Sequence, residues 1–371
     1  MSFLKRIEIS GYKSIKDIDL ELRRLNILIG ANGSGKSNLL SFFKLIREML
    51  QGRLQFFVGK EGGADTLLFY GSKTTKNIEA YLHLDDNGNL IIYKLRMIPT
   101  ARDSLQFERE KISFRNPNGN SEFGCGLEHN ESQLAQSIDI WRSHNEDLAV
   151  HAGEIVVQAI KHWGIFGFYD TSVMRLQRYI HDNSAIHSDG NNLVAILYKI
   201  RETQVTAYHR IVETIRQIAP WFGDFVIEPL ELNKNNVQLN WRDRYSDKVF
   251  GPHQLPDGGL RAIALVTLLL QSTDNLPSLI VIDEPELGLH PNAICIIAAL
   301  LKQASLHCQI IVATQSPTFL DEFDPEDVIV VDREEGKSLF TRQDPEKLRE
   351  WLEEYSLGEL WQKNSIGGGP F

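Results

Sequence analysis

The sequence predicts an α/β fold, in which helices cover a mostly parallel sheet and an antiparallel β-subdomain accompanies it. Two strand–loop–helix units carry this prediction. Apolar residues 26–29 precede a glycine-rich loop and a helical pattern over residues 38–50, and apolar residues 279–282 precede a helical pattern over residues 292–306. A further strand pattern follows at residues 309–313. Such alternation of strands and helices is typical of a mostly parallel sheet with helices on its faces.

The first 100 residues are predicted to form one lobe, which contains the first of these units and the antiparallel subdomain. Alternating apolar and polar residues predict four more strands, at residues 4–9, 15–22, 77–84 and 89–95. The last two flank Asp85-Asp86-Asn87-Gly88, which is a typical hairpin turn sequence. The glycine-containing stretch 62–71 is predicted to be loop.

Residues 101–245 are predicted to form a mainly helical insertion. Helix-length segments with polar breaks run from about residue 128 to residue 218. The insertion is too short for a long antiparallel coiled coil, and heptads are not sustained along it. Strand patterns return at residues 225–232 and 237–241.

Residues 246–340 are predicted to form the second lobe, and residues 341–371 an acidic and aromatic tail. The second lobe adds a helix at residues 258–270 and a strand at residues 328–332 to the second strand–loop–helix unit. The tail is expected to pack on the body of the protein or on a partner.

The composition, 42% hydrophobic and 24% charged residues, is typical of a globular protein. The net charge is −10, and residues 321–354 hold 13 acidic and 5 basic residues, so the rest of the chain carries about −2. These totals do not indicate a broad basic face that would bind nucleic acid, but they are compatible with local basic strips on the folded surface. No apolar run near the motifs approaches the roughly 20 residues of a membrane span, and the N-terminus lacks the apolar region of a signal peptide. A cytoplasmic location away from the membrane is therefore expected.

A loop after residues 26–29 fits the pattern G-x-x-x-x-G-K-[ST] without a mismatch. This phosphate loop consists of Gly30, Ala31, Asn32, Gly33, Ser34, Gly35, Lys36 and Ser37. Glycines let the backbone N–H groups approach phosphate oxygens, and the following helix N-terminus favours an anion. Lys36 is expected to reach the β- and γ-phosphates of ATP, and Ser37 to bind Mg²⁺. The alternative, a glycine-rich turn with an incidental lysine, does not explain the position between a buried strand and a helix.

A second motif, Asp283-Glu284, ends the apolar strand pattern 279–282. Asp283 is predicted to hold the Mg²⁺ water shell beside Ser37, and Glu284 to orient or deprotonate the attacking water. An ordinary acidic loop after a core strand is the alternative for this motif taken alone.

These motifs resemble those of the ABC-type ATPases of the RecF/SMC/OLD group. The likeness covers Asp-Glu-Pro-Glu-Leu-Gly-Leu-His-Pro at residues 283–291, the phosphate loop with Asn38 and Leu39, and the first strand at residues 9–15. It implies a P-loop NTPase of the ABC-ATPase head type, with ATP and Mg²⁺ as cofactors. It also implies that Asn38, Lys13 and Ser14 approach the nucleotide. The tail is similar to that of compact bacterial "predicted AAA-family ATPases", several of which serve in anti-phage defence beside a separate effector.

The signature loop of this group, Leu-Ser-Gly-Gly-Gln or Leu-Ser-Asp-Gly-Thr, has a divergent counterpart at residues 255–261. Asp257, Gly258 and Gly259 are expected to meet the γ-phosphate of ATP held by a partner subunit, which implies a homodimer or a larger assembly. Pro256 replaces the signature serine. A capped core helix is the alternative, because proline also suits a first helical turn.

The switch position differs as well, because Gln315 stands where many relatives have histidine. Glutamine can form hydrogen bonds but cannot carry a proton at neutral pH. It could instead simply cap the strand end. Pro256 and Gln315 together suggest slow turnover, with Glu284, Lys36 and Gln315 as the catalytic set.

Two functions remain open at this stage. In the first, the chain is an ATP-dependent switch or scaffold for a separate effector, a nuclease, in anti-phage defence. In the second, it is a DNA-repair or DNA-clamping ATPase that binds duplex DNA directly. The acidic balance and the short insertion favour the first. A transporter engine is not expected without a membrane segment, and an OLD-type nuclease would need a further metal-binding domain after residue 331.

Overall fold

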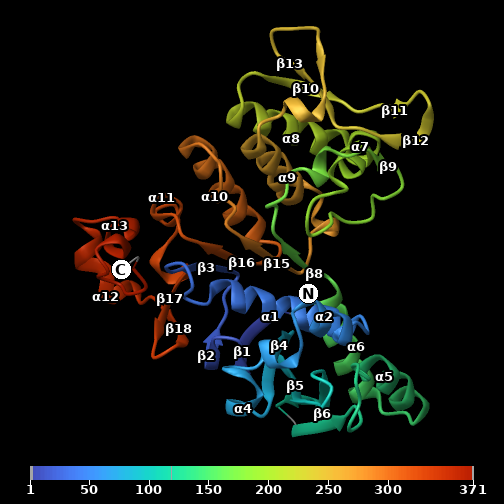
Figure 1. The fold of residues 1–371 in the computed structure, drawn as a ribbon, viewed down its shortest axis with the longest axis vertical. Helices are drawn as coiled ribbons and strands as arrows, with labels where there is room; N and C mark the ends of the chain where they lie inside the picture. Colours follow the sequence, from blue (N-terminus) through green and yellow to red (C-terminus); the bar gives the residue numbers. More distant parts are fainter. Residues whose placement is uncertain (1–2, 118, 370–371) are drawn as a thin grey trace. The chain divides into compact units, whose positions relative to one another are not determined.

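The computed structural model describes residues 3–117 and 119–369, and it divides them into two compact units. Unit 1 consists of residues 1–163, 325–355 and 359–371, and unit 2 of residues 164–324 and 356–358. Figure 1 labels the elements along the chain. Pro370, which ends the tail that resembles other ATPases, lies outside the described residues.

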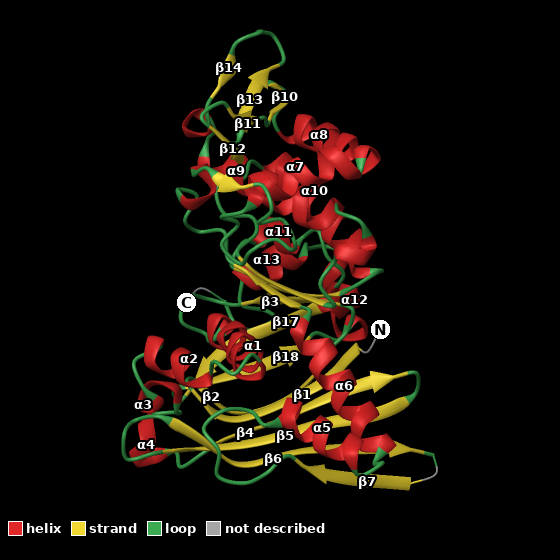
Figure 2. Cartoon of the chain, turned by 90° about the vertical axis from the view of Figure 1, so that its right-hand side faces the viewer, coloured by secondary structure: helices red, strands yellow, loops and turns green. Residues whose placement is uncertain are grey.

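Unit 1 contains an antiparallel sheet in the order β2-β1-β4-β5-β6-β7. Its strands are β1 (Phe3–Tyr12), β2 (Ile15–Glu21), β4 (Ile78–Asp86), β5 (Asn89–Pro99), β6 (Leu105–Asn116) and β7 (Gly119–Gly124). Alternate residues of β1 and β4 are buried, and helices α5 (Leu134–Ser143) and α6 (Asp147–Lys161) cover one face of the sheet (Figure 2). Burial of this alternating apolar set stabilises the sheet and fixes its register.

The predicted hairpin is confirmed. Asp86 pairs with Asn89, and Asn87 and Gly88 between them both have positive φ, at 51° and 89°. A two-residue turn of this kind requires positive φ at both positions, which asparagine and glycine tolerate best.

Unit 1 also holds the strand that leads into the phosphate loop. Strand β3 (Leu25–Ile29) is fully buried and pairs in parallel with β17 (Val328–Glu334), which pairs antiparallel with β18 (Lys337–Arg342). The remaining helices of the unit are α1 (Lys36–Leu50), α2 (Leu54–Lys60), α3 (Ala64–Leu67), α4 (Gly71–Thr74) and α12 (Pro345–Leu352). Helix α13 (Leu357–Gln362) and strand β8 (Trp163–Phe166) cross the unit boundary.

Unit 2 contains the parallel pair β15 (Leu279–Asp283) and β16 (Gln309–Thr314). Its helices are α7 (Leu193–Thr203), α8 (Val205–Ile218), α9 (Asp257–Leu270), α10 (Pro291–Ser305) and α11 (Pro317–Leu320). Two small sheets complete it, formed by β9 (Arg178–Tyr179), β10 (Phe222–Val226), β11 (Pro229–Leu230), β12 (Asn233–Val237), β13 (Asn240–Asp243) and β14 (Val249–Phe250). Helix α9 is almost entirely buried, which agrees with the apolar run in its sequence.

The segment 101–245 differs from the predicted helical insertion. Strands β6 and β7 occupy its beginning and extend the antiparallel sheet. Opposite Arg96 and Met97 of β5, strand β6 bulges at Glu108, which has no partner in the ladder, so the strand pattern of β6 changes phase within its length. The helices in the segment lie between residues 134 and 218, in both units.

Two other local predictions are wrong. Residues 62–71 contain α3 and the start of α4 rather than only loop, because Asp103 binds the backbone N–H of Ala64 through its carbonyl and that of Asp65 through its carboxylate. The strand predicted at residues 225–232 is two short strands, β10 and β11, separated before Pro229, which cannot donate to a ladder.

Candidate functional site

The phosphate loop connects β3 to α1 within unit 1, where a strand–loop–helix turn was predicted. Gly35 has φ 117°, and a Cβ atom there would lie 1.9 Å from Ser338 Oγ. Only glycine fits this position. The predicted glycine pattern is therefore required by the close packing of the loop against β18.

Lys36 and Ser34 give the loop the character of an anion site. Lys36 is 5% exposed, and its Nζ donates to the carbonyl oxygens of Gly30 at 2.6 Å and Ala31 at 3.1 Å. The ammonium group is thus held over the loop itself. Ser34 Oγ is buried and has no hydrogen-bond partner among the described residues. An orphan hydroxyl and a buried ammonium in one glycine-rich loop at a helix N-terminus fit a phosphate group.

Ser14 and Asn38 are linked to the phosphate loop by a chain of hydrogen bonds. Asn38 Nδ2 donates to Ser14 Oγ at 2.6 Å, and Ser14 Oγ is 2.6 Å from Ser338 Oγ. Ser338 Oγ in turn donates to Ser34 O at 2.6 Å. These two predicted residues therefore support the loop.

Lys13 faces a neighbouring cavity and is held by other partners. Its Nζ forms an ion pair with Glu61 at 2.8 Å and a hydrogen bond with Ser41 Oγ at 2.9 Å. The cavity has a volume of about 430 Å³ and is lined by Lys13, Ser14, Asn38, Asp65, Thr66, Leu68, Tyr70, Gly71, Arg333 and Gly336. Its volume lies in the range of small-molecule sites, and its lining is mostly polar, with one exposed aromatic ring at Tyr70.

Asp283 is the last residue of β15 in unit 2, and Glu284 follows it. Glu284 has φ 48°, and its N–H donates to Ala313 O at 2.8 Å, so its backbone is in the left-handed region and held against β16. Gln315 Nε2 donates to Glu284 Oε1. Gln315 therefore contacts the predicted base directly, in addition to following the end of β16.

Glu286 is a site residue that the sequence analysis missed. Its Oε1 accepts hydrogen bonds from Thr314 Oγ1 at 2.5 Å and from Gln315 N at 3.4 Å, and its Oε2 is buried without a partner among the described residues. Burial raises the pKa of this carboxyl above its ordinary value, against the effect of the Thr314 hydrogen bond. The third carboxylate in the run Asp-Glu-Pro-Glu was the available signal.

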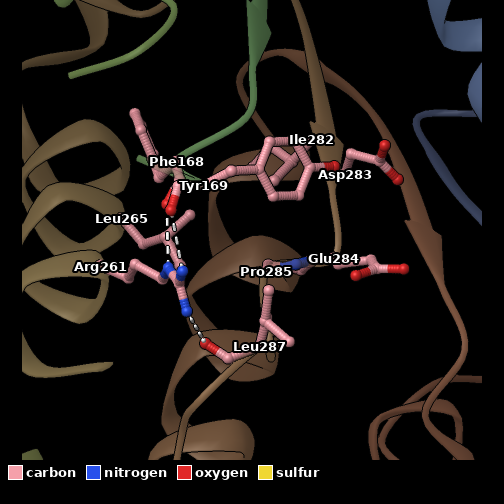
Figure 3. Close-up of a pocket in the computed structure, with 9 residues that line it drawn as sticks. All are labelled: Phe168, Tyr169, Arg261, Leu265, Ile282, Asp283, Glu284, Pro285 and Leu287. Atoms are coloured by element: carbon pink, nitrogen blue, oxygen red, sulfur yellow. Dashed lines mark hydrogen bonds between the residues drawn. The ribbon is translucent and has the colours of Figure 1, made fainter. Parts of the chain in front are cut away.

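Tyr169 is the second residue that was missed. Its hydroxyl donates to Asp283, and burial, with this hydrogen bond, raises the pKa of the phenol well above its ordinary value. Figure 3 shows the ring pointing toward Asp283. Arg261 of α9 holds the segment in place, because its guanidinium donates to Phe168 O at 2.9 Å, Tyr169 O at 2.9 Å and Leu287 O at 3.2 Å.

The signature-like loop packs inside unit 2. A Cβ atom at Gly258 would lie 2.1 Å from Gly288 O, so the start of α9 touches the loop after Asp283-Glu284. Asp257 accepts hydrogen bonds from Thr171 Oγ1 and Arg175 Nη2, both at 2.5 Å, and these lower the pKa of its carboxyl, Thr171 most. Pro256 precedes the helix in an extended conformation, and Gly259 continues its first turn.

The predicted site residues thus fall into two sets. Lys13, Ser14, the phosphate loop and Asn38 belong to unit 1, and Asp257–Gly259, Asp283, Glu284 and Gln315 belong to unit 2. Within each unit the structure brings the members together.

Among the described residues, no helix is long and apolar enough to cross a membrane.

Comparisons with known proteins place the chain in a family. The family model described as "AAA domain, putative AbiEii toxin, Type IV TA system" matches residues 25–321. An OLD nuclease of Thermus scotoductus (strain ATCC 700910 / SA-01) is 25% identical over 369 residues, which cover 90% of this chain and 65% of that protein. The chain therefore spans slightly less than two thirds of the length of this relative.

Two solved structures share the fold. The Smc head bound to the C-terminal winged-helix domain of ScpA has a TM-score of 0.61 at 18% identity, over 94% of this chain and 99% of that one. The Smc head with an extended coiled coil, bound to the C-terminal domain of ScpA derived from Pyrococcus furiosus, has a TM-score of 0.59 at 17% identity, over 95% and 99%. The α/β fold with its antiparallel subdomain is that of an SMC head, as the motifs predicted. The chain belongs to the AAA-domain family described as putative AbiEii toxins, and its fold is that of an SMC head.

Proposed function

We propose that the protein binds ATP with Mg²⁺, hydrolyses it slowly, and acts as a nucleotide-dependent switch or scaffold for a separate effector, a nuclease, in anti-phage defence. The observation that carries the ATP proposal is the phosphate loop, where Lys36 is buried over the loop carbonyls and Ser34 Oγ has no partner among the described residues. Membership of a P-loop ATPase family supports the same ligand.

The residues of unit 1 would bind the nucleotide. Lys36 exchanges its contacts with Gly30 and Ala31 for phosphate oxygens, and the backbone N–H groups of the loop complete the anion site. The cavity lined by Lys13 and Ser14 receives the nucleoside, with Tyr70 available to stack on the base. Ser37 and Asp283 would hold Mg²⁺, which neutralises developing charge on the phosphates.

The residues of unit 2 would perform the hydrolysis. Glu284 is the base that orients water, and the Gln315 amide holds its carboxylate in one orientation. Because the amide cannot accept or release a proton, we expect turnover below the median enzyme value of about 10 per second.

An assembly of several copies forms the second part of the proposal. Asp257, Gly258 and Gly259 stand where relatives bind the γ-phosphate of a partner subunit, so ATP would join two copies. The effector proposal rests on the relation to the AbiEii family and to an OLD nuclease. Cycling between joined and separated copies would then restrain or release the effector.

Native purification of Glu284→Gln with ATP and Mg²⁺ tests this proposal, with Lys36→Ala as the matched control. Glu284→Gln is expected to retain ATP, to form a dimer or larger assembly, and to co-purify with a nuclease. Lys36→Ala is expected to lose all three properties. If Glu284→Gln hydrolyses ATP like the wild type, Glu284 is not the base. If the wild type binds duplex DNA with a steep salt dependence and carries no effector, the DNA-clamping function replaces the switch.

A further inference from the structure

The C-terminal glycine segment touches the first part of the phosphate loop, and both belong to unit 1. The carbonyl oxygen of Gly368 accepts hydrogen bonds from the backbone N–H of Ala31 at 3.1 Å and from Trp361 Nε1 at 2.8 Å. The N–H of Gly368 donates to Asp332 Oδ2 at 3.2 Å. One tail residue is therefore fixed by three partners, of which Ala31 lies in the phosphate loop.

Packing against β17 requires glycine at this tail position. Gly368 has φ 62°, and a Cβ atom there would lie 2.6 Å from Val330 Cγ1 and 3.0 Å from Val331 O. A Cβ atom at Gly30 would lie 2.2 Å from the same Val331 oxygen. The phosphate loop and the tail thus both approach the carbonyl of Val331, and a side chain at either glycine would push one of them away.

The following residues of β17 and β18 hold the rest of the loop. Arg333 Nη1 donates to Gly33 O at 3.3 Å, and Ser338 Oγ donates to Ser34 O at 2.6 Å. These contacts and the tail contact fix the loop backbone at three positions. A phosphate loop that is already ordered in the folded protein loses less conformational entropy when a ligand binds. Its affinity for the ligand is therefore higher than that of a flexible loop.

We propose that Gly368 is a positioning residue for the phosphate loop, and that the docked tail, residues 364–369, keeps Ala31 in the conformation that binds a triphosphate. The proposal rests on the nucleotide binding proposed above. Gly368 does not touch the nucleotide and acts through Ala31. Trp361, which is 4% exposed, also holds the tail in place, because its Nε1–H donates to the carbonyl oxygen of Gly368.

Gly368→Ala in the full chain tests whether Gly368 positions the phosphate loop. We expect its affinity for a fluorescent ATP analogue to fall about tenfold, and hydrogen–deuterium exchange in the peptide covering residues 28–34 to accelerate in the protein without nucleotide. Gly52→Ala is the matched control, because Gly52 has φ 67° and no atom within 4 Å of an added Cβ. It carries the same backbone strain away from the loop, and we expect both readouts to stay at wild-type values.

Trp361→Phe provides a second variant, since it keeps the packed ring and removes only the Nε1–H donor. It is expected to shift the affinity and the exchange rate in the same direction as Gly368→Ala. If Gly368→Ala does not fold, Trp361→Phe tests whether the docked tail positions the phosphate loop. If a folded variant keeps the wild-type affinity for the ATP analogue and the wild-type exchange rate of residues 28–34, Gly368 does not position the phosphate loop. A wild-type protein that binds no nucleotide would overturn the proposed function instead, and the exchange measurement would still decide whether Gly368 holds Ala31.

Discussion

At the scale of single residues, Glu284 combines an unusual backbone with a held side chain. Its φ of 48° is in the left-handed region, which costs a non-glycine residue about 1 kcal/mol or more. The N–H of Glu284 is fixed by Ala313 O, and its carboxylate by Gln315. Strain of this kind clusters at functional sites, and here it lies at the predicted base.

Gln315→Ala is expected to lower the rate of ATP hydrolysis by roughly tenfold, less than the hundredfold or more that a positioned acid–base group contributes, because Gln315 orients Glu284 and transfers no proton. The affinity for ATP should change little, because Gln315 binds the carboxylate of Glu284, whereas the phosphate loop is proposed to bind the phosphates. Steady-state ATPase kinetics combined with a binding titration checks this. Gln158→Ala, on the exposed face of α6, is the control. An equal loss of affinity and rate would contradict the assigned role.

Glu286→Gln should change stability in a pH-dependent way. Burial raises the folded-state pKa of Glu286, so the native state binds its proton more tightly than the unfolded state does. The stability that this carboxyl contributes is present below its ordinary pKa of about 4.5 and is lost as the pH rises through the folded value. Relative to the wild type, Glu286→Gln is therefore expected to gain stability as the pH rises above about 4.5. Urea unfolding across this range measures the difference, and a difference independent of pH would contradict the prediction.

At the scale of elements, strands β5 and β6 place like charges opposite each other. Lys94 pairs with Lys111 and Arg96 with Arg109 in the ladder, an arrangement that destabilises a sheet. Glu122 of β7 accepts from both lysines, at 2.7 Å and 2.8 Å, and they lower its pKa to about 2. The short outer strand β7 thus compensates for charge repulsion in its neighbours.

Glu122→Gln is expected to lower the free energy of unfolding at pH 7 by at most about 1 kcal/mol, because the lysine pair loses its counter-charge at a partly exposed site. The folded pKa is depressed, so this contribution is present above pH 4.5 and is lost as the pH falls toward 2. Urea unfolding at low and high salt provides the measurement, and the effect should shrink in high salt. Glu350→Gln on the exposed part of α12 should have no effect.

At the scale of the whole molecule, the residues proposed to act on one nucleotide are divided between two units. Lys36 and Ser37 belong to unit 1, and Asp283 and Glu284 belong to unit 2. A ligand that binds only the native state raises its stability by mass action. Nucleotide and Mg²⁺ are therefore expected to raise the free energy of unfolding of the protein.

ATP with Mg²⁺ at a hundredfold excess over the dissociation constant is expected to stabilise the wild type by about 2.7 kcal/mol, seen as a higher Tm. Lys36→Ala should lose the whole increase, whereas Asp283→Asn should lose only the part that requires Mg²⁺. Thermal unfolding with ATP alone and with ATP and Mg²⁺ separates the two. An ATP-dependent rise in the Tm of Lys36→Ala would show that the phosphate loop is not the binding site.

Local sequence patterns were sufficient for several features. The phosphate loop, the Asn87-Gly88 turn and the buried strand before Asp283 each depend on contiguous residues, so their chemistry is readable without tertiary contacts. The SMC-head fold followed from the order of these motifs, and the comparisons confirm it. The roles of the predicted site residues remain predictions.

Other features depended on residues far apart in the chain. Asp103 accepts hydrogen bonds from the first N–H groups of α3, and a bulge at Glu108 shifts the phase of β6 against β5. Gln315 reaches Glu284 because β15 and β16 pair in parallel. The contact between Gly368 and Ala31 joins positions more than 300 residues apart. The sequence by itself determined the phosphate-loop motif, the acidic strand end and the predictions of phosphate and metal binding that rest on them. Tertiary structure decided which neighbours hold those residues in place, because hydrogen bonds and close packing depend on distance in space and not on spacing along the chain.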